Sequence, residues 1–240
     1  MRIVDIVLDL VYPRRCPVCG SILRHAKRSG YICPLCRRKL HYVEAPQCLR
    51  CGKHIESSEQ EYCEDCMRIP KHFTKGFPVF VYEGALKNSL LAFKYKNKRE
   101  YAAFYAEEIV RRYGTQLAKI HADAWVPVPV HRKRYRKRGY NQAALIAKEL
   151  SKRTQIPCYE HVLVRTVQTH VQKTLNDKQR YQNLKNAFKS PQNSVKLRKV
   201  ILVDDIYTTG ATIEACTCEL LRTGVEQVYY VSVSIGEGRS

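Results

Sequence analysis

The sequence predicts a mixed α/β protein in which a parallel sheet flanked by helices follows a small cysteine-rich domain. Eight of the eleven cysteines lie in the first 66 residues, all of them in C-x-x-C pairs. Beyond them, apolar strand-like runs alternate with stretches of helical periodicity, which is the pattern of a parallel sheet. One apolar run, residues 200–203, ends in two aspartates and a loop of threonine and glycine. These three observations define two domains, residues 1–75 and 76–240, with the boundary near Gly76.

The cysteine pairs predict two bound metal ions. A C-x-x-C turn places two thiolates close enough to share a tetrahedral Zn²⁺ at about 2.3 Å per sulfur, and two such knuckles complete one site. The unit CPVCGSIL…YICPLCRRKL is echoed by CLRCGKHI…EYCEDC, which indicates a double zinc ribbon. An iron–sulfur cluster, a redox pair or disulfides fit the repeat less well. Interleaved knuckles satisfy the same spacings, so the pairing stays open. The expected ligands are Cys16, Cys19, Cys33, Cys36, Cys48, Cys51, Cys63 and Cys66.

The remaining cysteines, Cys158, Cys216 and Cys218, lack partners at ligand spacing and are expected to be ordinary buried thiols. The elements expected after the ribbons follow in chain order. They are a strand at 78–84, helices at 85–96 and 100–113, a strand at 124–130, a basic loop at 131–138, a helix capped by Asn141, strands at 159–164 and 200–206, a helix at 212–223 ended by Gly224, and a strand at 225–236.

Charge and hydropathy limit the class of function. Lys and Arg number 42 against 22 Asp and Glu, a net charge of +20, so we expect a polyanionic partner. A basic surface that serves only solubility is the alternative. The opening MRIVDIVLDLVY is interrupted by Asp5 and Asp9 and precedes no small-residue cleavage site, so it is not a secretory signal. No run approaches the roughly 20 apolar residues of a membrane span. The expected protein is soluble and cytoplasmic, without membrane insertion.

The run VILVDDIYTTGAT predicts a site for a ribose phosphate. A buried strand at 200–203 brings Asp204 and Asp205 out at its carboxyl end, and residues 208–212 turn into the start of a helix. Glycine lets the backbone come close to a phosphate, and the N–H groups and helix dipole at a helix start favour an anion. Two carboxylates beside such a loop suit the hydroxyls of a ribose and help to hold Mg²⁺. A polar turn without a ligand is the alternative.

This run resembles the 5-phosphoribosyl-1-pyrophosphate (PRPP) signature of type I phosphoribosyltransferases. Together with VPVPVHRKRYRKRGYNQA, RTVQTHVQKTLNDKQRYQNLKNAF and the cysteine-rich start, the chain resembles the competence protein F family along nearly its whole length. The resemblance implies a cytoplasmic bacterial protein of DNA uptake, with zinc ribbons before a type I phosphoribosyltransferase-like domain. It implies pyrophosphate contacts at Val130, His131 and Arg132 and a flexible segment near 134–142. The implied PRPP residues are Asp204, Asp205, Thr208, Thr209, Gly210, Ala211 and Thr212.

The basic run indicates contact with single-stranded DNA. Six of the eight residues at 131–138 are Lys or Arg, and KYKNKR at 94–99 repeats the mixture. Cations that follow phosphates and a ring that stacks on bases are the means of binding single strands. The pyrophosphate of PRPP also attracts cations, and both uses of the run stay open. The residues expected at DNA are Arg132, Lys133, Arg134, Tyr135, Arg136, Lys137 and Arg138.

Three hypotheses of function follow. The first is a DNA-uptake factor that binds single-stranded DNA and carries a PRPP site. The second is an active phosphoribosyltransferase of nucleotide or base salvage, and the third is an adaptor whose ribbons dock a competence helicase or another DNA-processing protein. The sequence names no acceptor pocket and no catalytic residue, because a histidine in a basic loop such as His131 is more often a phosphate contact or solvated. Fold and ligand class are therefore better founded than turnover.

Overall fold

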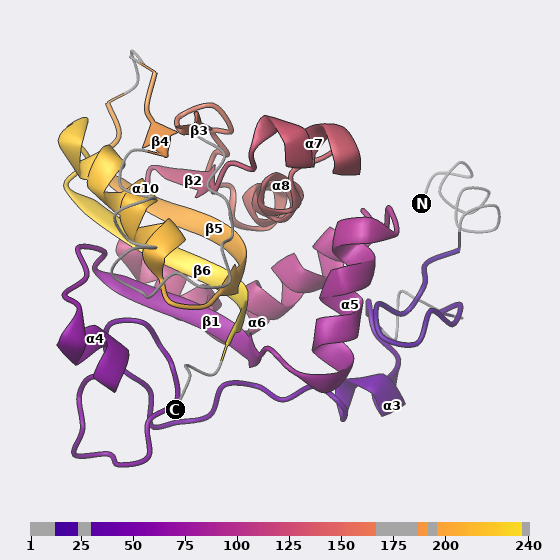
Figure 1. Cartoon of the computed structure of the whole chain (residues 1–240). Helices are drawn as coiled ribbons and strands as arrows, with labels where there is room; N and C mark the ends of the chain where they lie inside the picture. The colour runs from indigo at the N-terminus through magenta and orange to yellow at the C-terminus, as the bar shows by residue number, and fades with distance from the viewer. Residues whose placement is uncertain (1–12, 24–29, 167–186, 192–195, 237–240) are drawn as a thin grey trace.

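A four-stranded parallel sheet forms the centre of the protein in this computed structural model (Figure 1), which describes residues 13–23, 30–166, 187–191 and 196–236. The strand order is β1-β6-β5-β2, and each neighbouring pair is parallel. The strands are β1 (Lys75–Val81), β2 (Ala124–Pro127), β5 (Lys199–Tyr207) and β6 (Gln227–Ile235). The helices are α3 (Pro34–Arg37), α4 (Glu64–Arg68), α5 (Gly84–Tyr95), α6 (Tyr101–Ile120), α7 (Arg132–Arg138), α8 (Gln142–Thr154) and α10 (Ala211–Arg222). The expected parallel sheet flanked by helices is confirmed.

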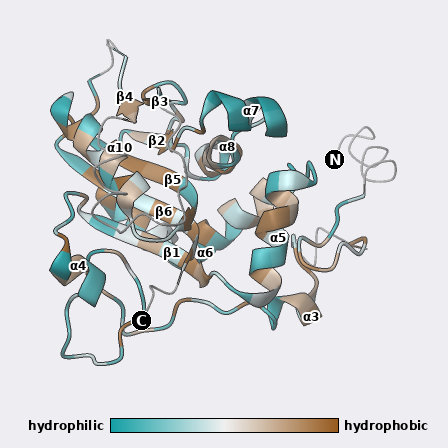
Figure 2. Cartoon of the chain, viewed as in Figure 1, coloured by the Kyte–Doolittle hydropathy of each residue, from teal (hydrophilic) through white to brown (hydrophobic). Residues whose placement is uncertain are grey.

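The two faces of the sheet carry separate hydrophobic cores. Ile201 and Val203 of β5 pack with α5, α6 and α8, whereas the alternate residues Val200 and Leu202 pack with α10. This alternation is the two-residue period of a strand that is covered on both faces. Figure 2 shows hydrophobic residues along the central strands β5 and β6, whereas α7 is hydrophilic along its length.

Each knuckle pair joins a different core. Cys16 and Cys36 belong to the core on the α5–α6 face, and Cys48, Cys51 and Cys63 belong to the core on the α10 face. In Figure 1, α3 accordingly lies near α5, and α4 lies at the other end of β1. The chain between them, residues 41–43, pairs antiparallel with β1 and covers that edge of the sheet.

Two expectations about local structure were wrong. The basic segment after β2 is not a loop, because it forms α7, which the His131 side chain caps by accepting from Lys133 N at 3.2 Å and which ends at Gly139 with φ 76°. Residues 159–164 do not form a further strand of the sheet. Only Cys158 bridges to β2, and the chain then forms β3 (Val164–Arg165), which pairs antiparallel with β4 (Phe188–Lys189).

Other boundaries moved by a few residues. The helix predicted at 100–113 extends to Ile120, and β2 ends at Pro127 rather than at 130. Asn141 caps α8 as expected, accepting from Ala143 N at 3.1 Å. Gly76, the predicted domain boundary, lies within β1. No helix in the described part of the chain is both long enough and apolar enough to cross a bilayer.

Candidate zinc and ribose-phosphate sites

The eight ribbon cysteines form two compact groups of four thiols. Cys19 Sγ and Cys33 Sγ are 3.9 Å apart, and Cys51 Sγ and Cys63 Sγ are 3.6 Å apart. A tetrahedral ion at about 2.3 Å from each sulfur separates the sulfurs by about 3.8 Å, so both groups fit Zn²⁺. The grouping also resolves the pairing, since consecutive knuckles share a site: Cys16, Cys19, Cys33 and Cys36 form one group, and Cys48, Cys51, Cys63 and Cys66 form the other.

Each group contains at least one thiol that is already biased toward the thiolate that a metal requires. Hydrogen bonds with Ser21 lower the pKa of Cys19 to about 6. Hydrogen bonds with the other thiols of its group, Cys51 first, hold the pKa of Cys48 well below the usual range. The four thiols of each group, at the spacing given above, form a donor set that is chemically suited to zinc.

The acidic pair lies inside β5 rather than at its exposed end, which corrects the expectation from the sequence. Asp205 Oδ2 is 2.6 Å from Lys94 Nζ of α5, and these side chains are 13% and 16% exposed. Lys94 belongs to the basic run at 94–99, which was expected to contribute to the basic surface. Its side chain is instead largely buried against Asp205. In that run Lys98 also pairs with Glu100, at 3.7 Å.

Asp204 faces a different environment. Successive residues of a strand point to opposite faces, so Asp204 points away from the face of Asp205. The charged neighbours of Asp204 include Arg165. Burial, and then the negative charge of Asp205, raise the pKa of Asp204 well above its ordinary value. A buried carboxyl with a raised pKa, in the carboxyl-terminal half of a strand of a parallel sheet, is typical of a ligand site.

The loop after β5 has the backbone of an anion site. Gly210 adopts φ 76° and is the N-cap of the twelve-residue helix α10. A Cβ at Gly210 would lie 2.2 Å from the hydroxyl of Tyr207, so only glycine fits there. Lys71, from the segment after the second ribbon, donates to Thr209 O at 3.3 Å. The predicted phosphate residues therefore comprise a short loop and the first two residues of α10, with a lysine beside them that sequence reasoning missed. The loop residues are Thr208, Thr209 and Gly210, and the helical ones are Ala211 and Thr212.

A pair of stacked aromatic rings packs against the loop at Gly210. Tyr207 and Tyr230 stack with centroids 4.9 Å apart and planes 4° apart. The hydroxyl of Tyr230 donates to Cys51 O, in the second zinc group, at 2.7 Å. Contacts therefore run continuously from a metal ligand to the residue against which Gly210 packs.

The predicted pyrophosphate residues line a cavity of about 740 Å³. Val130, His131 and Arg132 line it, together with Arg136 and the half-exposed Tyr135. His161 and Arg165 also line it. Burial, and then the nearby guanidinium of Arg134, lower the pKa of Arg165, which marks a cavity that favours an anion.

Of the residues expected at DNA, those from Arg132 to Lys137 are exposed. Within the described residues, no ion pair joins any of them to a carboxylate. Arg138 instead bonds Gln142 at 2.9 Å and the Tyr95 hydroxyl at 3.1 Å, and it stacks on the Tyr95 ring. The predicted flexible segment at 134–142 covers most of α7 and the start of α8. Most of the motif RTVQTHVQKTLNDKQRYQNLKNAF lies outside the described residues.

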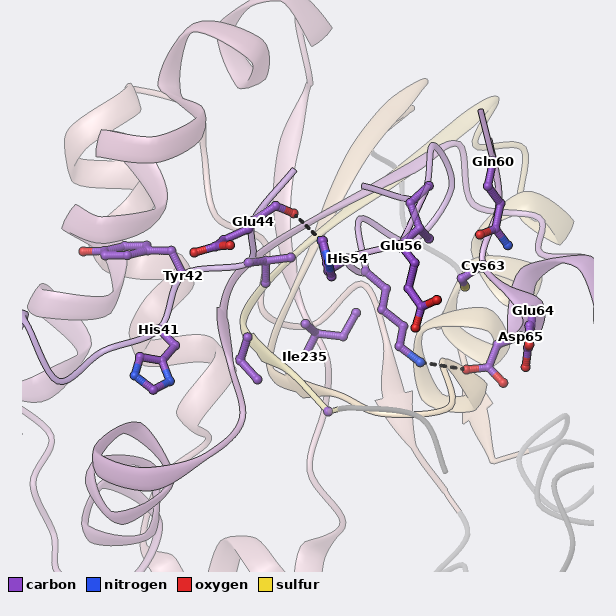
Figure 3. Close-up of a pocket in the computed structure, with 15 residues that line it drawn as sticks. His41, Tyr42, Glu44, His54, Glu56, Gln60, Cys63, Glu64, Asp65 and Ile235 are labelled. Carbon is purple, nitrogen blue, oxygen red and sulfur yellow. Dashed lines mark hydrogen bonds and ion pairs between the residues drawn. The ribbon is translucent and has the colours of Figure 1, made fainter. Parts of the chain in front are cut away.

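A second cavity, of about 630 Å³, lies between the second ribbon and the carboxyl ends of β1 and β6 (Figure 3). Its wall includes Gly236, whose N–H donates to Tyr207 O at 2.8 Å beside the loop. Lys53 pairs with Asp65 at 3.8 Å across its rim. The wall also carries the imidazoles and carboxylates of His41, Glu44, His54, Glu56 and Glu64.

Comparisons with known proteins agree with this organisation. The family model described as "Double zinc ribbon domain" matches residues 7–67. "Competence protein F" of Haemophilus influenzae is 31% identical over 220 residues, which is 89% of this chain and 93% of that protein. The chain belongs to the competence protein F family. "DNA utilization protein YhgH" of Escherichia coli is 29% identical, covering 91% of this chain and 96% of its own, and "Competence protein ComFC" of Bacillus subtilis is 28% identical, covering 80% and 79%.

Among solved structures, a purine phosphoribosyltransferase from Pyrococcus horikoshii is a neighbour of this family member. It aligns with a TM-score of 0.34 and 13% identity over 57% of this chain and 84% of its own. That score is too low to support a conclusion about the site. The assignment of the loop and the acidic pair therefore depends on the contacts described above.

Proposed function

We propose that this protein is a cytoplasmic DNA-uptake factor of natural competence that binds single-stranded DNA and carries a PRPP site. Relatives that match most of the chain are named for competence and for DNA utilization. The observation that carries the proposal is the placement of a phosphate-type loop at Gly210 and an exposed basic helix α7 after neighbouring parallel strands, β5 and β2. Both therefore lie at the same edge of the sheet.

PRPP, or another ribose 5-phosphate, would use three sets of groups. The 5-phosphate would take the N–H groups and hydroxyls of residues 208–212. Asp204 and Asp205 would accept hydrogen bonds from the ribose hydroxyls. Lys94, which pairs with Asp205 here, would then move away from it or bind a phosphate of the ligand. The cavity with Arg132 and Arg165 suits the pyrophosphate. Mg²⁺, when bound with PRPP, would neutralise phosphate charge, and the carboxylates are oxygen donors of the kind it prefers.

Single-stranded DNA would follow the exposed face of α7. Its cations have no carboxylate partner in the described part of the chain, so counterion release on binding phosphates is available to them. Tyr135, 52% exposed, offers a ring for stacking. The same relatives support a place among DNA-processing proteins, so a competence helicase docked by the ribbons is part of the proposal.

A paired titration tests both ligands. Magnesium-PRPP and a single-stranded oligonucleotide are titrated separately and together by calorimetry into the native protein and two variants. Asp204→Asn with Asp205→Asn should lose PRPP binding and keep DNA binding. Replacing Arg132, Lys133, Arg136 and Lys137 with Ser should weaken DNA binding and flatten its salt dependence, whose slope is about −3 if four phosphates are neutralised.

The outcomes separate the two halves of the proposal. Equal PRPP affinity in the folded double aspartate variant would remove the ribose site. An unchanged salt slope in the serine variant would move DNA to another surface. Lys39, Lys87, Lys119 and Lys152, which are exposed and lie outside α7, provide a matched control with the same loss of four positive charges.

An active phosphoribosyltransferase is the second candidate, and the cavity of about 630 Å³ favours it. An acceptor in that cavity would lie beside the loop, because Gly236 contacts Tyr207 there. His41 and His54 on its wall are candidate proton acceptors. Release of pyrophosphate from PRPP in the presence of bases or nucleosides, lost in the double aspartate variant, would support turnover. Its absence with every acceptor class would leave PRPP as a bound effector.

A further inference from the structure

A third group of metal-type donors lies outside both ribbons. His72 Nδ1, Glu214 Oε1 and Cys218 Sγ all lie within 4.8 Å of one another. His72 comes from the segment between the second ribbon and β1, and Glu214 and Cys218 occupy positions i and i+4 of α10. Residues four apart on a helix share a face, so two donors from one helix meet a third from the linker.

The distances to sulfur match those around a tetrahedral zinc ion. Cys218 Sγ is 3.7 Å from His72 Nδ1 and 3.6 Å from Glu214 Oε1. An ion at about 2.3 Å from sulfur and about 2.0–2.1 Å from nitrogen and oxygen separates sulfur from each of them by about 3.5 Å. Nδ1 and Oε1 share a hydrogen bond here, and an ion in place of that proton would move them apart to about 3.3 Å.

The carboxylate is also held as a metal ligand usually is. The side chain of Glu214 is fully buried, and the His72 N–H donates to both of its carboxylate oxygens, at 3.1 Å to Oε1 and 3.0 Å to Oε2, which fixes the orientation of the carboxylate. Such outer contacts orient metal ligands in proteins. The side chain of His72 is 57% exposed, so a fourth position toward solvent is open to water.

We infer that His72, Glu214 and Cys218 form a third divalent-metal site, of the mixed nitrogen, oxygen and sulfur type that zinc occupies. Because this site has three protein ligands and one open position, its ion exchanges with metal in solution more readily than the ions of the two four-cysteine sites. It ties the segment that follows the second ribbon to α10, which begins within the predicted phosphate loop. The inference is independent of the proposed function, because it concerns only metal and these three side chains.

Metal counting on the full-length protein tests the site. After equilibration with zinc and removal of the free ion, elemental analysis should find three zinc ions per chain in the native protein and two in Cys218→Ser and in His72→Ala. Cys158→Ser, which also removes a half-buried thiol but lies outside the group, should keep three. Circular dichroism and thermal unfolding establish that each variant is folded.

Cobalt gives a second readout of the same site. Co²⁺ added to protein that keeps two zinc ions should produce a thiolate-to-cobalt band of a single sulfur, present in the native protein and in Cys158→Ser and lost in Cys218→Ser. A native chain that holds two ions only, with no cobalt band, would overturn the inference. So would a third ion that survives in both Cys218→Ser and His72→Ala.

Discussion

The two carboxylates of the acidic pair should affect stability in opposite directions. Burial and the charge of Asp205 raise the pKa of Asp204, so ionised Asp204 destabilises the fold at neutral pH. Asp204→Asn removes that cost with little change of shape, and substitutions that relieve a functional site stabilise by about 0.5–2 kcal/mol. Asp205→Asn leaves Lys94 without the carboxylate that lies 2.6 Å away. Losing one partner of a buried pair costs about 3–5 kcal/mol, and the remaining exposure of both side chains reduces this to about 2–3 kcal/mol.

The pH dependence distinguishes this explanation from a general change in packing. Because its folded-state pKa is raised, Asp204 contributes stability that is complete below its unfolded pKa of about 3.9 and is lost as the pH rises through the folded value. The gain in unfolding free energy of Asp204→Asn should therefore grow with pH. Urea unfolding followed by circular dichroism at pH 6, 7 and 8, with zinc in the buffer, measures it. A gain that is constant over this range, or an Asp204→Asn protein less stable than the native one at pH 8, would refute the reasoning.

Three further substitutions address the ribbons and the loop. Cys63→Ser should reduce the zinc content by one ion per chain, because it removes one of the four thiols of its group, and an unchanged content by elemental analysis would contradict that site. Gly210→Ala should cost about 1–3 kcal/mol and weaken phosphate binding, since its Cβ meets Tyr207. Gly224→Ala, with φ 97° and open space, isolates the backbone strain alone. Tyr230→Phe should cost about 1–3 kcal/mol in urea unfolding by leaving Cys51 O unpaired, whereas an equal loss in Tyr229→Phe on the same strand would argue against that bond.

The local patterns predicted most of the architecture. C-x-x-C spacing is a short-range signal, and the two groups of four thiols formed as it indicates. Strands that are covered on both faces are apolar along nearly their whole length, so the apolar runs in the sequence correctly predicted β1, β2, β5 and β6. The segment at 159–164 carries a similar trace, yet Val162 and Leu163 bury in the core without joining the sheet. Apolar content alone does not distinguish a strand from a buried connection.

The parts that sequence reasoning missed depend on contacts between distant residues. Six cations in eight residues indicated a solvated loop, but Lys and Arg are good helix formers, and His131 supplies the cap. Lys94 lies far from Asp205 in the chain, and no local pattern predicts their contact. Lys71 and His72 were part of an inconspicuous linker, and only the fold brings them to Thr209 and Glu214.

The ribbons are integral to the sheet domain rather than appended to it. Each one buries cysteines in a different core, so the two ribbons pack on opposite faces of the sheet. On the α10 face the connection continues from Cys51 through the stacked rings of Tyr230 and Tyr207 to Gly210. Close-packed cores transmit displacements instead of absorbing them. These contacts connect the loop at Gly210, which we propose to bind a ribose phosphate, with a four-cysteine site about 160 residues earlier in the chain, and they give a physical reason for zinc ribbons and such a loop to be parts of one protein.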